Sequence, residues 1–399
     1  MLDLICIIFR ILLKIISKFI LTCSLIFLVA CTSLESMDPN IGSVPFSIYQ
    51  SKTIKEIKAN RVFQSSDTAM ELQWNAPQEW KPVSIEQGEK PKKGILFVHG
   101  LGDSPWSFHD IAKQLANDGY LVRTVLLPGH GTTPFELLDV TAEDWQRVVY
   151  EQALSLQNDV SGDVFLGGFS TGANLVLDYA YQHPNIAGLI LFSPGFKSMP
   201  FDWLAPIASR VMPWVITPKE DTTMQTPLRY MNVPTNGYAQ YYRTSVRARK
   251  LLKKKYNKPV FLAVAEHDSV LDTKYLLNTF VNYFTHPSSR LIWYGELPKE
   301  QKDSARILVR SDKLPQDKIS QFSHMGLLFS PDNPLYGKNG SERICLNSMS
   351  DELTIACEKS SDLWFSAWGY EEKGKIHARL TFNPYFNWQL DTLLGVIHN

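Results

Sequence analysis

Apolar runs of strand length alternate with helix-length segments along most of this 399-residue chain. The expected strands are 94–98, 120–127, 164–167, 187–192, 260–265 and 291–293, and the expected helices are 105–117, 143–157, 173–182, 273–284 and 386–396. Such alternation is typical of βαβ units, which build a mostly parallel sheet with helices on both of its faces. The sequence therefore predicts the α/β fold class.

A glycine-flanked serine stands between the expected strand 164–167 and the helix 173–182. The segment is Gly168-Phe169-Ser170-Thr171-Gly172. A sharp strand-to-helix turn has little room for side chains, so glycines beside the serine suit it. We predict that Ser170 is a nucleophile and that the backbone N–H of Thr171, at the helix N-terminus, stabilises an oxyanion. The alternative is an ordinary glycine-rich turn.

The chain also offers an acid and a base downstream of this serine. A serine nucleophile needs a base to take its proton, and the base needs an acid to orient it, in the chain order serine, acid, histidine. Asp268 follows the expected strand 260–265, and Glu266 in the same loop is the alternative acid. His324 is the candidate base. The order of these residue types favours a triad of Ser170, Asp268 and His324.

Two histidine-containing segments resemble loops of the α/β-hydrolases. Residues 96–104, Leu-Phe-Val-His-Gly-Leu-Gly-Asp-Ser, resemble the His-Gly loop after an earlier central strand, and residues 127–131, Leu-Pro-Gly-His-Gly, resemble the turn after the next strand. The resemblance implies that the backbone N–H of Leu101 is the second oxyanion donor. It also implies structural roles for His99 and His130.

The acid and base segments carry the same resemblance. Residues 264–270 resemble the family's acid loop, although Ala265 stands where many relatives have glycine, and residues 322–326 resemble its base loop. Residues from about 90 to 330 thus resemble the monoacylglycerol lipase and carboxylesterase branch of the α/β-hydrolases, also described as serine aminopeptidase-like. The interval from acid to base is longer than the family usually shows, which predicts an insertion over 298–321.

The resemblance implies hydrolysis of a carboxylic ester through an acyl-enzyme, with a small-molecule or lipid ester as substrate. No metal or organic cofactor is expected, because no cluster of His, Cys and carboxylates has the spacing of metal ligands. One alternative is a serine aminopeptidase or amidase of the same fold, for which Glu220-Asp221 is the obvious candidate to hold a substrate amine. Another is a non-catalytic envelope lipoprotein.

An insertion over 195–258 is rich in Pro, Met, Trp and Tyr and separates two expected strands. Within it, Leu204, Ile207, Ala208 and Val211 have helical spacing. An aromatic, apolar insertion at this place predicts a cap or lid over a pocket, with an extra packing helix as the alternative. Its end carries seven basic residues between 243 and 255, which suit a solvated helix face or an anionic membrane surface.

The N-terminus has the pattern of an export signal. Three basic residues precede an apolar run over 19–30. The run ends in Leu-Val-Ala before Cys31, which resembles a bacterial lipobox and predicts a lipidated Cys31 at the mature N-terminus. The alternative is an uncleaved membrane anchor. We expect a cell-envelope protein held in a membrane by lipid, and Thr32, in place of a retaining aspartate, favours the outer membrane.

The predicted domains are a signal peptide over 1–30, a tether over 31–60, an α/β-hydrolase core over 61–194 and 259–399, and the cap over 195–258. Forty basic and forty acidic residues cancel, so nucleic-acid binding is not expected. Cys345 and Cys357 remain in the mature body, and two thiols in an oxidising compartment predict one disulfide. The alternative is two separately buried thiols.

Overall fold

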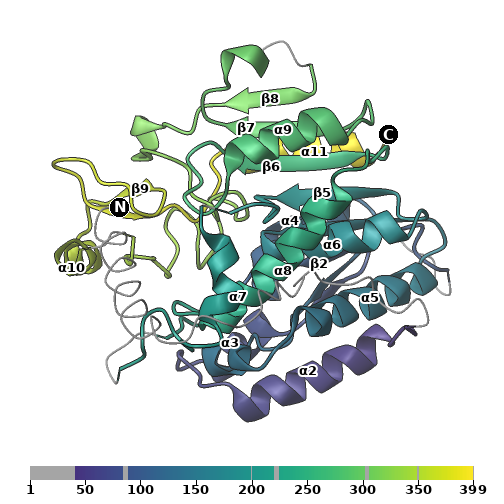
Figure 1. Cartoon of the computed structure of the whole chain (residues 1–399), viewed down its shortest axis with the longest axis horizontal. Coiled ribbons are helices and arrows are strands. Elements are labelled where there is room, and N and C mark those ends of the chain that lie inside the picture. Colours follow the sequence, from purple (N-terminus) through teal and green to yellow (C-terminus); the bar gives the residue numbers. More distant parts are fainter. Residues whose placement is uncertain are drawn as a thin grey trace, which may run out of the picture. The chain divides into compact units, whose positions relative to one another are not determined.

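The computed structural model describes residues 41–83, 89–198, 200–219, 224–301, 305–347 and 350–398 (Figure 1). The predicted signal segment 1–30, the lipidation candidate Cys31 and the Glu220-Asp221 pair lie outside the described residues. Within the described ranges, no helix combines the length and the apolar character that a membrane crossing requires.

A mostly parallel sheet of eight strands runs through the described part of the chain (Figure 1). In spatial order the strands are β1 (Glu79–Trp80), β3 (Tyr120–Val125), β2 (Lys93–Val98), β4 (Asp163–Phe169), β5 (Gly188–Phe192), β6 (Val260–Ala265), β7 (Arg290–Tyr294) and β8 (Ile307–Arg310). Only β1 is antiparallel to its neighbour. The parallel strands all end at the same edge, where the loops after β2, β4 and β6 meet.

Helices cover both faces of this sheet. They are α4 (His109–Asn117), α5 (Ala142–Asp159), α6 (Thr171–Gln182), α8 (Thr235–Leu251), α9 (Thr273–Tyr283) and α11 (Phe386–Ile397). Side chains of α5, α6, α8 and α9 join one hydrophobic core, while those of α4 and α11 join the other. Strand β2 alternates between the cores, with Leu96 and Val98 in the first and Ile95 and Phe97 in the second. This two-sided burial confirms the predicted α/β class.

Residues 46–60 belong to the folded body, so the prediction of a tether over 31–60 is wrong for this part. They form α2 (Phe46–Asn60), which is followed by α3 (Thr68–Asn75). Phe46, Tyr49, Thr53 and Ile57 recur every three or four residues and form the buried face of α2. The Tyr49 hydroxyl donates to the Leu126 carbonyl (2.9 Å) and accepts from the Leu126 N–H (2.8 Å), which fixes the helix beside β3.

The insertion after β7 adds a strand to the sheet. Strand β8 pairs in parallel with β7, and Ile307 at its start is buried. Two 3-10 turns flank it, η4 (Lys299–Gln301) and η5 (Pro315–Asp317). Strands β1 and β8 at the two edges were not expected from the sequence, because they have only two and four residues.

Part of the chain beyond the base loop, from Cys345 to Arg379, forms a small unit with its own core. It contains α10 (Asp351–Lys359) and the parallel pair β9 (Trp364–Ser366) and β10 (His377–Arg379). Cys345 and Cys357 are joined by a disulfide and pack with Leu363 and Ala378. A bridge between Ile319 and Phe365 links this unit to the segment that leads to the base loop.

Candidate active site

Ser170 occupies the turn between β4 and α6 in a backbone conformation that is rare for a residue with a side chain, with φ 52° and ψ −114°. Its N–H donates to Phe192 O (3.1 Å), and its carbonyl accepts from Ala173 N (3.1 Å) and Gly195 N (2.9 Å). These backbone hydrogen bonds hold the turn in place. The side chain therefore stands at the carboxyl edge of the sheet.

The neighbouring glycines are required by close packing. A Cβ atom on Gly172 would lie 2.0 Å from the Val98 carbonyl oxygen, and one on Gly168 would lie 2.5 Å from the Ala173 nitrogen. Both distances are far below van der Waals contact with backbone atoms that cannot yield. The spacing of glycines around Ser170 thus follows from how tightly α6 packs against β2 and β4.

Asp268 and His324, which are 56 residues apart, meet across the loops after β6 and β8, where Asp268 Oδ2 accepts a 2.6 Å hydrogen bond from His324 Nδ1. The other oxygen, Oδ1, accepts from Val270 N (2.8 Å) and Leu271 N (3.2 Å). The Asp268 side chain is fully buried. Because an ionised carboxylate only accepts, the His324 proton sits on Nδ1, which leaves Nε2 as a proton acceptor.

The imidazole of His324 also lies beside the turn that carries Ser170. Its ring centroid is 4.9 Å from that of Phe169, the residue directly before Ser170. The Ser193 hydroxyl donates to the His324 backbone carbonyl (3.1 Å) and anchors the base loop next to β5. The structure thus brings Asp268 and His324 into contact and places both at the sheet edge that carries Ser170.

The proposed oxyanion donors belong to the loop after β2 and to the residue that follows the serine. A Cβ atom on Gly100 would lie 3.1 Å from Ser170 Cβ, so the loop after β2 passes directly beside Ser170. Neither the Leu101 N–H nor the Thr171 N–H donates a hydrogen bond to another described residue. Two backbone donors without protein partners, next to a serine hydroxyl, are suited to bind a developing oxyanion.

His99 and His130 are buried and hold the loop instead of facing a substrate. Burial lowers the pKa of His99 to about 4 and that of His130 to about 3, so both rings are neutral at pH 7. Nε2 of His99 accepts from Leu127 N (3.0 Å), and Nε2 of His130 accepts from Gly102 N (3.0 Å). These contacts agree with the structural roles that the family resemblance implied.

The alternative acid, Glu266, has a different hydrogen-bond partner from Asp268. Its Oε2 accepts from the Glu296 N–H (2.5 Å) in the turn after β7. Sequence reasoning missed a second pair in the same loop, in which His267 Nδ1 lies 2.5 Å from the buried carboxylate of Asp312. This hydrogen bond raises the pKa of His267. Asp312 lies just after β8, 45 residues from His267 in the sequence, and no local motif marks it.

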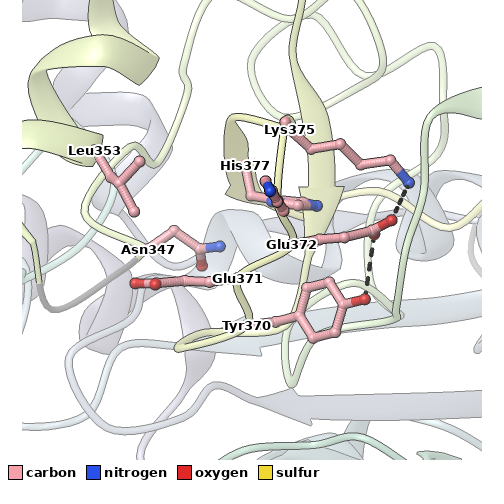
Figure 2. A pocket seen from close by; sticks show the side chains of 9 residues that line it. Asn347, Leu353, Tyr370, Glu371, Glu372, Lys375 and His377 are labelled. Carbon is pink, nitrogen blue, oxygen red and sulfur yellow. Dashed lines mark hydrogen bonds and ion pairs between the residues drawn. The ribbon is translucent and has the colours of Figure 1, made fainter.

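A cavity of about 310 Å³ lies in the disulfide-containing unit, apart from these residues (Figure 2). Its wall is polar and charged and includes Asn347, Glu371 and His377. In Figure 2, Glu372 binds both Lys375 (2.7 Å) and the Tyr370 hydroxyl (3.2 Å). None of the three triad candidates lines this cavity, and its polar wall does not suit an acyl chain. Among the described residues, no cluster of His, Cys and carboxylates could hold a metal ion.

Comparison with known families gives the same assignment as the topology. The sequence model of the serine aminopeptidase S33 family matches residues 89–297, which is more than half of the chain. The chain belongs to this family. Its fold is that of the α/β-hydrolases, with an antiparallel edge strand, the serine turn after a central strand and the acid loop two strands further along the sheet.

Several relatives are known by activity. The chain is 34% identical over 97 residues to a thermostable monoacylglycerol lipase of Bacillus sp., covering 24% of this chain and 38% of that protein. It is 26% identical over 110 residues to a carboxylesterase of Bacillus subtilis, covering 28% and 43%. The matches therefore span less than half of these curated relatives. A solved monoglyceride lipase from Saccharomyces cerevisiae shares 19% identity with a TM-score of 0.43, over 55% of this chain and 81% of that one.

Proposed function

We propose that this chain is a serine hydrolase that cleaves carboxylic esters, with lipid esters as its substrate class. The observation that carries the proposal is the 2.6 Å contact between Asp268 and His324, made beside a serine in a strained turn. An imidazole oriented by a buried carboxylate is the group that a serine hydroxyl needs for activation, and this supports the proposal. The names of the lipase and carboxylesterase relatives support ester hydrolysis.

In this reaction, Ser170 Oγ attacks the ester carbonyl carbon while His324 Nε2 takes the hydroxyl proton. Asp268 keeps the imidazole in the required tautomer and stabilises its positive charge. The Leu101 and Thr171 N–H groups bind the oxyanion of the tetrahedral intermediate. The intermediate then expels the alcohol, which receives the proton from His324. Water, activated by the same imidazole, releases the acid from the acyl-enzyme and restores Ser170.

The cap supports a lipid ester as substrate. Beyond the serine turn it contains η3 (Asp202–Leu204), α7 (Ala205–Ala208) and the longer α8. Six large apolar residues in this part of the cap have 52–75% of their surface exposed: Phe201, Trp203, Ile207, Val211, Val215 and Ile216. We call these six residues the cap patch. So many exposed apolar side chains in one short stretch mark a surface that meets other apolar material.

The basic segment of the cap makes contacts within the fold. Arg247 is bound to the buried Asp178 (2.8 Å), and Arg249 donates to Phe196 O (2.8 Å). These contacts favour the solvated and structural role of the segment over membrane binding.

We further propose that the protein is an exported lipoprotein whose Cys31 carries the lipid that anchors it in a cell-envelope membrane. The support is the lipobox pattern that ends at Cys31 and the absence of the usual retaining aspartate at Thr32. The disulfide between Cys345 and Cys357 supports an oxidising compartment. Labelling cells with a radioactive fatty acid tests this, because Cys31→Ser should abolish incorporation while Cys23→Ser should not.

A substrate panel tests the activity. We expect the purified protein to hydrolyse p-nitrophenyl esters, and Ser170→Ala to lower kcat by at least about a thousandfold. The control Ser161→Ala changes a serine at the opposite end of β4 and should leave kcat unchanged. Turnover of aminoacyl nitroanilides without ester turnover would instead favour the aminopeptidase alternative. A folded protein that turns over neither would favour the non-catalytic lipoprotein.

A further inference from the structure

Three consecutive peptide groups of the oxyanion loop are each held by a different side chain or segment. The Gly100 carbonyl, which shares a rigid peptide plane with the Leu101 N–H, lies 2.7 Å from His99 Nδ1. The next peptide group donates its Gly102 N–H to His130 Nε2 (3.0 Å). In the third peptide group, the Gly102 carbonyl accepts a hydrogen bond from the Tyr230 N–H (2.7 Å). The direction of the Leu101 N–H therefore depends on His99, His130 and Tyr230.

His130 and Tyr230 support each other. Their rings stack with centroids 5.8 Å apart and planes within 7°. The Tyr230 hydroxyl accepts from Thr132 N (3.0 Å) and donates to Gly129 O (3.2 Å), which ties it to both sides of the turn that carries His130. The base of the cap and the turn after β3 thus form one support behind the oxyanion loop.

Arg61, between α2 and α3, joins the two halves of this support. Its guanidinium donates to Gly131 O (2.9 Å) in the turn after β3 and to Pro227 O (2.8 Å) at the base of the cap. Nε is bound to Glu71 (2.7 Å), and the two side chains are 1% and 0% exposed. Arg61 lies before residue 89, where the match to the serine aminopeptidase family begins. Its role therefore concerns a part of the chain outside the matched residues.

Only arginine has the geometry for these contacts. Its planar, forked guanidinium presents donors in several fixed directions, whereas the ammonium of lysine is a point charge on a flexible stem. Glu71 compensates the buried charge and also accepts from the Gln64 N–H (2.9 Å), so the carboxylate is itself held in place. The fork can then bridge two backbone carbonyls from separate segments.

We propose that Arg61 is a positioning residue for the reaction, which acts through Tyr230 and His130 to fix the direction of the Leu101 N–H toward the oxyanion. This inference rests on the proposed ester hydrolysis. It assigns the N-terminal segment a part in transition-state stabilisation, so loss of Arg61 should reduce the rate of the chemical step more than the binding of substrate.

The test compares Arg61→Lys with Arg123→Lys in the full chain. Arg123 is also buried and bound to two carboxylates, Glu79 and Asp159, but it lies on β3 away from the oxyanion loop. Both variants are expected to lower Tm. Only Arg61→Lys should lower kcat on a soluble p-nitrophenyl ester, by about tenfold with KM within about twofold, at a temperature where both are folded. An unchanged kcat in Arg61→Lys would overturn the proposal.

If Arg61→Lys does not fold, Tyr230→Phe provides the test of the proposal. It keeps the ring on His130 but removes the bonds to Thr132 and Gly129, and it should give a smaller fall in kcat of about threefold, again with KM nearly unchanged. Equal losses of kcat in Arg61→Lys and Arg123→Lys would overturn the proposal, since they would reflect general destabilisation. If the wild-type protein does not turn over esters, the proposed function itself is wrong. This result is known before any variant is measured.

Discussion

Asp312 accepts a 2.5 Å hydrogen bond from Nδ1 of His267, the residue directly before the candidate catalytic acid. Asp312 follows β8, the strand that the insertion between acid and base adds to the sheet. The insertion thus lengthens the sequence between Asp268 and His324. It also provides a buried carboxylate that binds the acid loop. The insertion therefore has a structural role, which is to hold the acid loop.

The His267–Asp312 contact predicts a pH-dependent stability. Its hydrogen bond raises the pKa of His267 above the usual 6.5, while Glu266 also raises it and Lys313 lowers it. The stabilisation is therefore fully present below pH 6.5 and is lost as pH rises through the higher folded pKa. His267→Gln should lower Tm more at pH 5.5 than at pH 9. Equal losses of Tm at both values would contradict this, with the half-buried His286→Gln as a control.

Replacing Asp268 should reduce activity but leave the fold intact. Asp268→Asn removes the charge that orients His324 and stabilises the imidazolium, so kcat should fall by about 10⁴. Glu266→Gln, in the same loop but directed toward Glu296, should retain most of kcat. Steady-state kinetics with a p-nitrophenyl ester make the comparison. Similar losses in the two variants would show that the acid has been assigned wrongly.

The cap patch predicts a preference for aggregated substrate. Burial of one large apolar side chain contributes about 1.5–3 kcal/mol. The double change Trp203→Ser with Ile207→Ser should therefore reduce hydrolysis of an emulsified long-chain ester by at least about tenfold, with little effect on a soluble short-chain ester. Val62→Ser is the control, because Val62 is 58% exposed but lies outside the cap. Parallel losses on both esters would show that the patch supports the fold instead.

The disulfide predicts a contribution to stability. Its two cysteines are 12 residues apart, and closing a loop of this size lowers the entropy of the unfolded chain by an amount worth about 3 kcal/mol. Cys345→Ser with Cys357→Ser should lower the free energy of unfolding of the C-terminal unit by about this amount, as measured by urea denaturation. Wild type in reducing buffer should behave like the double variant. No difference between reduced and oxidised wild type would contradict the prediction.

The parts of the site that sequence could predict are those whose information is local. The turn around Ser170 is specified within five residues, because a side chain at Gly168 or Gly172 would clash with neighbouring backbone atoms. Asp268 and His324 followed from their order along the chain. The direction of the Leu101 N–H depends on Tyr230 and Arg61, which come from distant segments without a motif. Such contacts are set by tertiary packing, which a local pattern does not encode.

The fold shows the same division. Strands β2 to β7 are mostly apolar and were predicted to within two residues at each end. Helix α2 was missed because its buried face has only four residues and its exposed side is rich in Lys and Glu. Strand β8 was missed because it is four residues long and lies between charged segments, so only its pairing with β7 makes it a strand.

Adduct mapping tests the central claim most directly. Wild-type protein treated with a fluorophosphonate and digested should give one modified peptide, with the added mass on Ser170. His324→Ala should slow this labelling by at least about a hundredfold, because the serine then lacks its base. An adduct on another residue, or labelling at the wild-type rate in His324→Ala, would contradict the proposed triad.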